Sequence, residues 1–295
     1  MRFADNNGTR IYWEEHGEGE PLLLIMGLGY SSEMWHRTTP VLSRHYRTIL
    51  FDNRGVGRSD CPEGPYTMPE MARDAAAVVE AVGCERVHVF GVSMGGMIAQ
   101  EFALAYPKRT ISLILGCTAA GGPEAVPAEA EVTATLSARG YMSPEEGIQA
   151  MVPYIYDEST PRERIDEDLE IRRRTFPKPE SYFAQIAGIM MFEAYSRLPR
   201  LSAPTLVIHG ENDRLVPCAN GKLIADRIPG ARFVPIKNAS HIFITDQERQ
   251  SHEAILGFLS EIPQFAPSGV GRSDASSDGF LQEAPKRKTE GTEEN

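Results

Sequence analysis

The chain has 295 residues, of which 41% are hydrophobic, and its 41 acidic and 30 basic side chains give a formal net charge of −11. This composition excludes collagen-like, disulfide-scaffold and wholly disordered proteins, because enough apolar surface is present to build a large core. The net negative charge repels polyanions, so we expect no nucleic-acid partner and no membrane partner.

The cellular context can also be predicted from patterns that the sequence lacks. No stretch approaches the roughly 18–20 consecutive apolar residues of a spanning helix, and the first residues lack the apolar segment of a secretory signal. The four cysteines are widely spaced and form no metal-type pair, which is typical of a reducing compartment. We therefore expect a cytoplasmic protein.

Short β-rich runs and helical runs alternate along the first 120 residues. The predicted strands span 10–13, 22–26, 46–51, 87–92 and 111–115. The clearest predicted helix spans 68–82, with Thr67 and Glu70 spaced as a capping box at its start and Gly83 directly after it. This alternation predicts an α/β fold, in which helices cover both faces of a mainly parallel sheet.

The pattern changes near Gly121, and no convincing strand follows before Leu201. Two helix starts in this region, at Ser143 and Thr160, combine an N-cap residue with a proline and a glutamate in the first turn. The β/α pattern then resumes with predicted strands at 205–208 and 232–236 and predicted helices at 219–227 and 247–259.

These changes divide the chain into four predicted parts. Residues 1–120 and 202–262 form the two halves of one α/β core, and residues 121–201 form an inserted helical cap. Residues 263–295 are rich in Ser, Gly, Pro, Lys and Glu, so they cannot bury enough apolar area to offset their ordering entropy. We expect them to form a disordered tail.

A G-x-S-x-G motif spans residues 91–95, directly after a predicted strand and before a predicted helix at 97–106. A serine in so tight a turn is held with its hydroxyl above the sheet, and glycines remove the Cβ atoms that would clash. The N-terminus of the helix adds unpaired N–H groups and a positive dipole end that suit an oxyanion. The context therefore favours Ser93 as a nucleophile over a glycine-rich turn without chemistry.

A serine hydroxyl needs a base that accepts its proton. Of the seven histidines, His241 is favoured, because it follows the last predicted strand at the edge where strand carboxyl ends open. His209 ends a predicted strand and is expected to be a packing residue.

The predicted acid is Asp213, in the loop after the strand at 205–208, with Glu211 as its rival two positions earlier. Such an acid holds the imidazole in the tautomer that can accept the serine proton. The chain order Ser93, Asp213, His241 matches one hydrolase architecture and differs from the two protease orders.

Backbone donors for an oxyanion are expected in the loop Met26-Gly27-Leu28-Gly29, where glycines let the backbone approach a ligand closely. The predicted oxyanion hole consists of the N–H groups of Leu28 and Met94. The alternative is a plain turn after a strand.

Several motifs together resemble the α/β-hydrolase fold superfamily: GVSMGG around Ser93, the loop MGLG, the stretch DNRGVGRS at 52–59, GENDRLVP at 210–217, and Ser240-His241. GVSMGGMIAQEFA is similar to small esterases, 3-oxoadipate enol-lactonases and cofactor-free haloperoxidase-like perhydrolases. The resemblance implies an eight-stranded sheet, a cap in the position of the helical insert, and structural roles for Asp52 and Arg54. The chain has Met26-Gly27 where the family often has His-Gly.

The leading functional hypothesis is a serine hydrolase that cleaves a carboxylic ester or lactone through an acyl-enzyme, as in a carboxylesterase or lactonase, with no metal or organic cofactor. The alternatives are a perhydrolase or haloperoxidase-like enzyme, a C–C bond hydrolase or hydroxynitrile lyase on the same triad, and a non-catalytic ligand-binding protein of this fold.

The expected partner is a small apolar ester or lactone, and a homodimer is possible. Substrate-binding candidates are Met97, Met190, Met191 and Phe192, because methionines make adaptable apolar pockets; ordinary helix packing is the alternative for each of them.

Overall fold

The computed structural model describes residues 1–263, which belong to one compact unit. The predicted tail, from residue 264 onward, lies outside the described residues. Among the helices of residues 1–263, none combines the length and the apolarity that crossing a bilayer requires.

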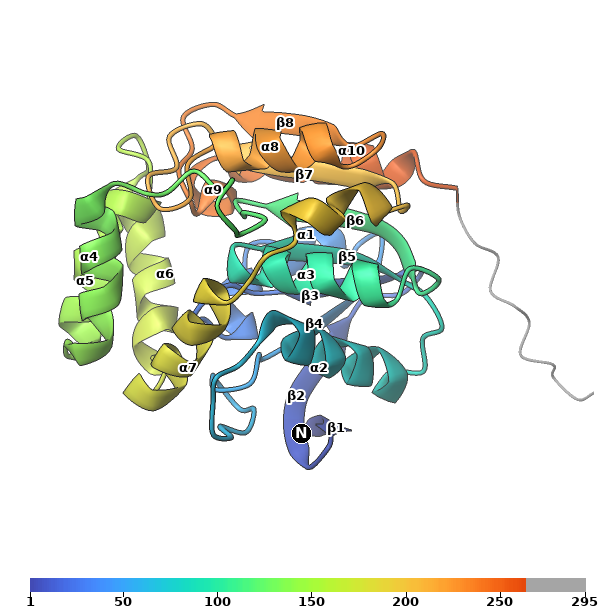
Figure 1. Cartoon of the computed structure of the whole chain (residues 1–295), viewed down its shortest axis with the longest axis horizontal. Helices are drawn as coiled ribbons and strands as arrows, with labels where there is room; N and C mark the ends of the chain where they lie inside the picture. The colour runs from blue at the N-terminus through green and yellow to red at the C-terminus, as the bar shows by residue number, and fades with distance from the viewer. Residues whose placement is uncertain (264–295) are drawn as a thin grey trace, which may run out of the picture. The chain divides into compact units, whose positions relative to one another are not determined.

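Within residues 1–263, eight strands form one sheet in the order β1-β2-β4-β3-β5-β6-β7-β8 (Figure 1). Their bounds are β1 Arg2–Asn6, β2 Thr9–His16, β3 Pro21–Ile25, β4 Arg47–Phe51, β5 Val87–Val92, β6 Thr110–Gly116, β7 Thr205–Gly210 and β8 Arg232–Ile236. The β1–β2 and β2–β4 pairs are antiparallel, and the remaining pairs are parallel. The predicted mainly parallel, eight-stranded sheet is confirmed, although the sequence patterns did not reveal β1.

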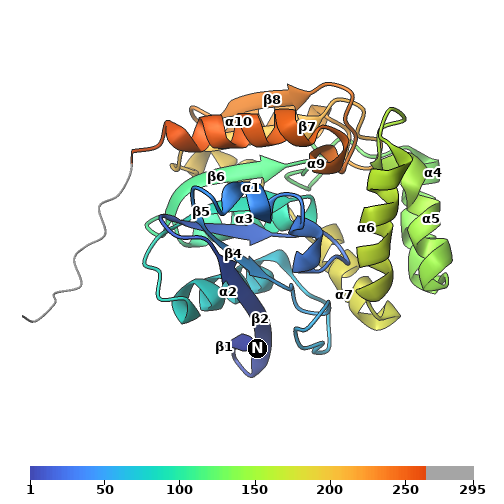
Figure 2. The same ribbon diagram turned by 180° about the vertical axis from the view of Figure 1, so that it is seen from behind.

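Helices cover both faces of the sheet, as predicted. One face carries α2 (Met68–Ala81), α3 (Met94–Ala105) and α8 (Ala219–Arg227), and the other carries α1 (Thr39–Leu42) and α10 (Glu248–Ser260) (Figures 1 and 2). In β3, Leu23 and Ile25 belong to the core under the first face, and Leu22 and Leu24 belong to the core under the second. Burial on both faces explains why this strand is an uninterrupted apolar run.

Four α-helices lie between β6 and β7 in sequence: α4 (Ala130–Ala138), α5 (Pro144–Ile155), α6 (Arg162–Arg174) and α7 (Pro179–Met190). They are grouped beyond one end of the sheet in both ribbon views (Figures 1 and 2). Helices α4, α5 and α6 share a small core of their own, which includes Val132, Met151 and Leu169. The remaining short helices are η1 (Ser32–Trp35), η2 (Arg139–Tyr141), η3 (Tyr195–Arg200) and α9 (Phe243–Asp246).

One of the three predicted helix caps is formed. At α5, Ser143 Oγ accepts from Glu146 N and Glu146 Oε2 accepts from Ser143 N, so the capping box is complete. The prediction is wrong at α2, where the Thr67 side chain makes no capping bond. It is also wrong at Thr160, whose hydroxyl donates to Asp246 Oδ1 at 2.6 Å while α6 begins two residues later. The Thr160 hydroxyl is therefore used for a tertiary hydrogen bond to Asp246 and does not cap the helix.

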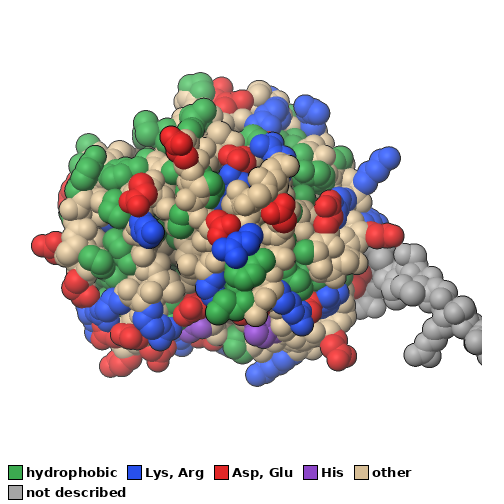
Figure 3. Space-filling model, turned by 90° about the horizontal axis from the view of Figure 1, so that it is seen from below, with side chains coloured by type: hydrophobic (Ala, Val, Ile, Leu, Met, Phe, Trp, Pro, Cys, Tyr) green, Lys and Arg blue, Asp and Glu red, His purple; other side chains and the backbone are tan. Residues whose placement is uncertain are grey.

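The surface drawn in Figure 3 mixes acidic and basic side chains, with small apolar areas between them. On that face the charges of both signs are interspersed rather than gathered into one large area.

Candidate active site

Ser93 lies at the turn between β5 and α3. Its φ of 56° and ψ of −124° fall in a region that residues other than glycine rarely adopt, at a cost of about 1–3 kcal/mol. Two hydrogen bonds hold this conformation: Ser93 N donates to Gly116 O at 2.8 Å, and Thr118 Oγ1 donates to Ser93 O at 2.7 Å. The strained turn is therefore fixed by the end of β6 and the residues that follow it.

The glycines of the G-x-S-x-G motif are required by close backbone contacts. A Cβ atom at Gly91 would lie 2.1 Å from Gly95 O, and one at Gly95 would lie 2.1 Å from Ile25 O. These contacts involve backbone atoms, which cannot rotate away as a side chain can. The motif therefore packs the first turn of α3 directly against the end of β3.

Asp213, in the loop after β7, has a fully buried carboxylate with several donors around it. Its Oδ1 accepts from Leu215 N at 2.9 Å and Val216 N at 2.8 Å, and its Oδ2 lies 2.8 Å from His241 Nδ1. Burial alone would raise the pKa of this carboxyl, but the imidazoles of His241 and His209 hold its pKa well below the ordinary value. The carboxylate is charged at neutral pH, and it holds Nδ1 so that His241 Nε2 stays available as an acceptor.

The rival acid does not share this environment. The side chain of Glu211 is exposed, whereas the side chains of Asp213 and His241 are buried. The structure thus brings together the favoured acid and the favoured histidine, and it leaves Glu211 facing solvent.

His241 is held by a loop that contacts the helices beyond the sheet. Ser240 N donates to Asp246 Oδ2 at 2.7 Å, and Ile242 N donates to Ile155 O at 2.9 Å. Burial raises the pKa of Asp246 to about 6, against the opposing effect of the hydrogen bonds that its carboxylate accepts. The loop around the histidine therefore depends on α5 and α9 as well as on β8.

The predicted oxyanion loop follows β3 and contacts α7. Gly29 N donates to Gln185 Oε1 at 2.9 Å, and Gln185 Nε2 donates to Arg54 O at 2.9 Å, with Gln185 fully buried. As the first residue of α3, Met94 has an N–H without an intrahelical acceptor. Leu28 and Met94 both line the cavity beside Ser93. Sequence reasoning missed Gln185, whose only signal is a polar side chain within an apolar helical stretch.

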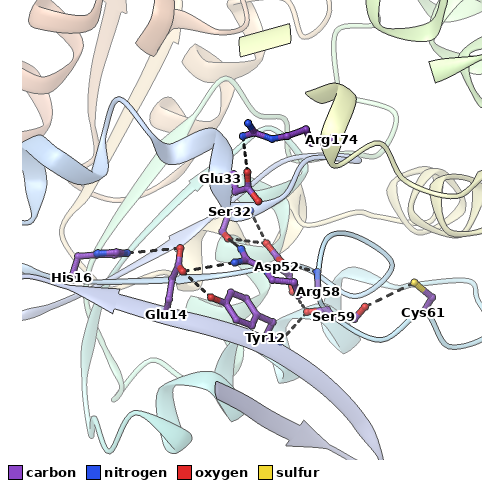
Figure 4. A network of polar contacts seen from close by, with 10 residues as sticks. All are labelled: Tyr12, Glu14, His16, Ser32, Glu33, Asp52, Arg58, Ser59, Cys61 and Arg174. Atoms are coloured by element: carbon purple, nitrogen blue, oxygen red, sulfur yellow. Dashed lines mark hydrogen bonds and ion pairs between the residues drawn. The ribbon is translucent and has the colours of Figure 1, made fainter. Parts of the chain in front are cut away.

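A second polar network, around Asp52, holds Ser32 of η1, which follows this loop in the sequence (Figure 4). The buried Asp52 carboxylate accepts from both the N–H and the hydroxyl of Ser32 at 2.8 Å, and from Arg58 N at 2.9 Å and Arg58 Nε at 3.0 Å. Arg54, two residues after Asp52, forms a bidentate pair with Asp74 of α2. Both residues hold turns together, which agrees with the structural roles that the family resemblance implies.

A cavity of about 200 Å³ opens between Ser93 and the helices beyond the sheet. It is smaller than the roughly 300–1,000 Å³ of pockets for drug-sized ligands. Its lining residues are Met26, Gly27, Leu28, Tyr30, Val92, Ser93, Met94, Met97, Leu136, Arg139, Met151, Ile155, Ile189, Leu215, Val216, His241 and Ile242. The site thus combines an apolar wall with a serine and a histidine.

The predicted substrate-binding set requires a correction. Met97 lines the cavity, but Met190 and Met191 are 82% and 65% exposed, and Phe192 is buried in the core under α2 and α3. Consecutive helical positions point about 100° apart, and it is Ile189, one position before Met190, that faces the cavity. The predicted residues therefore lie at or just after the correct end of α7, but they do not face the cavity.

Cys117, His209 and Asp213 bring potential metal-ligand atoms within 4.8 Å of one another. Cys117 Sγ, His209 Nε2 and the Asp213 carboxylate already have partners, whereas His209 Nδ1 has none among the described residues. Gly210 N donates to Cys117 Sγ at 3.5 Å, and His209 Nε2 lies 2.8 Å from Val216 O and 3.2 Å from Asp213 Oδ2. Burial raises the pKa of the Cys117 thiol well above its ordinary value. His209, expected only to pack, instead adjoins the acid.

Comparison with known proteins gives consistent results. The family model for the alpha/beta hydrolase fold matches residues 20–145. RutD of Azorhizobium caulinodans, to which carbamate hydrolysis is provisionally ascribed, is 32% identical over 90% of this chain and all of its own length. The solved structure of an enol-lactonase from Burkholderia xenovorans is 27% identical, with a TM-score of 0.79 over 88% of this chain and 100% of its own. A thermophilic esterase from Thermogutta terrifontis is 29% identical, with a TM-score of 0.78 over 88% of this chain and 98% of its own.

Proposed function

Because the chain belongs to the α/β-hydrolase fold family, we propose that it hydrolyses carboxylic esters or lactones through an acyl-enzyme on Ser93. The observation that carries this proposal is the buried Asp213–His241 pair at 2.8 Å, which adjoins the same cavity as the strained Ser93. An oriented imidazole and a serine that line one cavity are what nucleophilic acyl transfer requires.

In the proposed first step, His241 Nε2 takes the proton of Ser93 Oγ while the oxygen attacks the ester carbonyl. Asp213 stabilises the imidazolium that forms, and the N–H groups of Leu28 and Met94 bind the developing oxyanion. The imidazolium then gives its proton to the leaving alkoxide. Among the described residues, the side-chain hydrogen bonds of this triad are those of the Asp213 carboxylate. The contact between Ser93 Oγ and His241 Nε2 forms part of the proposal.

In the second step, His241 takes a proton from water, and the resulting hydroxide attacks the acyl-enzyme carbonyl. The tetrahedral intermediate collapses, Ser93 leaves with the proton from His241, and the carboxylic acid is released. A lactone follows the same steps, except that its alcohol stays attached to the acyl group.

We further propose that residues 121–201 act as a cap over this site, with 1–120 and 202–262 as the core. Leu136, Met151 and Ile189 of the helical segment line the cavity opposite Ser93. An apolar wall of this kind favours a small apolar acyl or alcohol group.

The test is hydrolysis of p-nitrophenyl butyrate by purified protein, with Ser93→Ala as the decisive variant. We expect turnover by the wild type and a loss of about 10⁴-fold or more in kcat for Ser93→Ala, because the variant cannot form the acyl-enzyme. Covalent labelling of Ser93 by a fluorophosphonate would support the activated serine. Wild-type activity retained by Ser93→Ala would refute the proposal, and folded protein without turnover or labelling would favour a ligand-binding protein.

A further inference from the structure

The cavity beside Ser93 contains one side chain with a permanent charge, Arg139 of η2. The other lining residues are apolar, apart from Gly27 and the polar side chains of Tyr30, Ser93 and His241. Arg139 is only 2% exposed, so its guanidinium has been removed from water. A buried cation is costly unless a partner compensates for the lost hydration.

Within residues 1–263, Arg139 has no such anionic partner. No carboxylate of this part of the chain forms an ion pair with it, and its Nε and Nη2 atoms have no hydrogen-bond acceptor. The guanidinium lies 5.4, 5.1 and 5.1 Å from the ring centroids of Tyr30, Phe176 and Tyr182. Aromatic faces stabilise the charge, but Nε and Nη2 still lack acceptors.

Two other buried arginines can be compared with Arg139. Arg54 binds Asp74 through two hydrogen bonds of 2.6 and 2.7 Å. Arg172, which also lies over the ring of Tyr30, has the Asp168 carboxylate in its electrostatic surroundings, but its Nε, Nη1 and Nη2 atoms have no hydrogen-bond acceptor among the described residues. Arg139 differs from both because the space beside it is the cavity in front of the predicted nucleophile.

We propose that Arg139 binds a carboxylate carried by the substrate, so that the enzyme acts on small esters or lactones with one anionic end. This inference rests on the proposed function and refines its substrate class. The planar guanidinium matches a carboxylate through parallel N–H···O bonds. Leu136, Met151 and Ile189 would cover the apolar chain between that carboxylate and the scissile bond.

Two matched pairs of esters test the proposal and locate the carboxylate. Methyl pentanoate and monomethyl glutarate differ only in a terminal methyl or carboxylate on the acyl side, and butyl acetate and 4-acetoxybutanoate differ in the same way on the alcohol side. Hydrolysis is followed by proton release. We expect the anionic member of at least one pair to have the higher kcat/KM in the wild type.

Arg139→Met removes the charge and keeps an apolar side chain of similar length. We expect it to lower the ratio of kcat/KM for the anionic ester over the neutral ester by about 100-fold, because the substrate carboxylate then loses its buried partner. The matched control is Arg173→Met in α6, which makes the same change of net charge. Arg173 is 38% exposed and pairs with Glu145, so we expect its ratio to stay within about twofold of the wild type.

A binding measurement separates substrate recognition from catalysis. Glutarate should raise the thermal unfolding temperature of the Ser93→Ala protein, and adding Arg139→Met should abolish that shift. Ser93-dependent hydrolysis in which the neutral member of both pairs is preferred would overturn this inference and leave the proposed function standing. An unchanged ratio in folded Arg139→Met would also overturn it. Absence of any Ser93-dependent hydrolysis would instead refute the proposed function on which the inference about Arg139 rests. If Arg139→Met does not fold, the wild-type preference decides.

Discussion

Replacing Asp213 by asparagine is the most informative single change at this site, because the structure predicts how the new amide will lie. Two backbone donors, Leu215 N and Val216 N, point at Oδ1 from 2.9 and 2.8 Å. They require an oxygen there, so the new NH₂ group must face His241 Nδ1, which lies 2.8 Å from Oδ2 in the wild type. The side chain keeps its place, but its hydrogen bond to the imidazole is reversed.

The reversed hydrogen bond changes the tautomer of His241. When Nδ1 has to accept, the proton of the neutral ring moves to Nε2, which then cannot take the proton of Ser93. A wrong tautomer of this kind lowers kcat by about 10⁴-fold, which is about 5.4 kcal/mol of transition-state stabilisation. We also expect the protein to lose about 1.5–3 kcal/mol of stability, the contribution of a charge-assisted hydrogen bond.

The assay is kcat for p-nitrophenyl butyrate at pH 7.5, corrected for the rate of Ser93→Ala. Glu211→Gln is the matched control, since it neutralises an exposed carboxylate two positions away, and we expect it to stay within about threefold of the wild type. Circular dichroism would establish that both variants are folded. The assignment of the acid is refuted if folded Asp213→Asn keeps more than a tenth of wild-type kcat, or if Glu211→Gln loses as much.

Two further predictions concern the fold. The pKa of Asp246 is raised to about 6 by burial, so its contribution to stability is fully present below the unfolded value near 4 and is lost as the pH rises through 6. Asparagine does not titrate, so the free energy of unfolding of Asp246→Asn, relative to that of the wild type, should rise by up to about 3 kcal/mol between pH 4 and pH 7. Urea denaturation at both pH values measures this difference, and a difference that does not change with pH would contradict the prediction. Gly95→Ala should lower the free energy of unfolding by more than about 3 kcal/mol, because its Cβ would lie 2.1 Å from Ile25 O. Gly257→Ala, which has open space around it on α10, is the control and should raise that free energy by up to about 1 kcal/mol. Similar melting temperatures for the two variants would show the close contact at Gly95 to be harmless.

The elements that could be predicted from the sequence have a strong local pattern. The strand at 232–236 and the helix at 219–227 were predicted with the bounds that the structure shows. By contrast, β1 has the sequence RFADN at the edge of the sheet, and Ala4 is its one buried residue. A strand with so little buried surface owes its place to pairing with β2, which no local pattern contains.

The site shows the same division between local and distant causes. The turn at Ser93 could be predicted because glycine spacing encodes it, and chain order pointed to Asp213 and His241. The residues of the cavity wall could not be predicted, because the side of a helix that faces a cavity depends on how that helix is rotated against the core. Arg139 could not be identified as a cavity residue for a related reason. A single arginine in a helical segment resembles a solvated surface residue until its burial is known.

The close packing around Ser93 limits how the enzyme can be redesigned. Added Cβ atoms at Gly91 and Gly95 would meet backbone oxygens at 2.1 Å, and one at Gly27 would lie 3.1 Å from Ser93 Cβ. The turn at Ser93 and the loop that faces it therefore cannot be varied one position at a time without disturbing each other. Positions such as Leu136 and Ile189 approach the same cavity from separate helices, and they are where a mutant library could alter substrate choice while leaving the reacting groups in place.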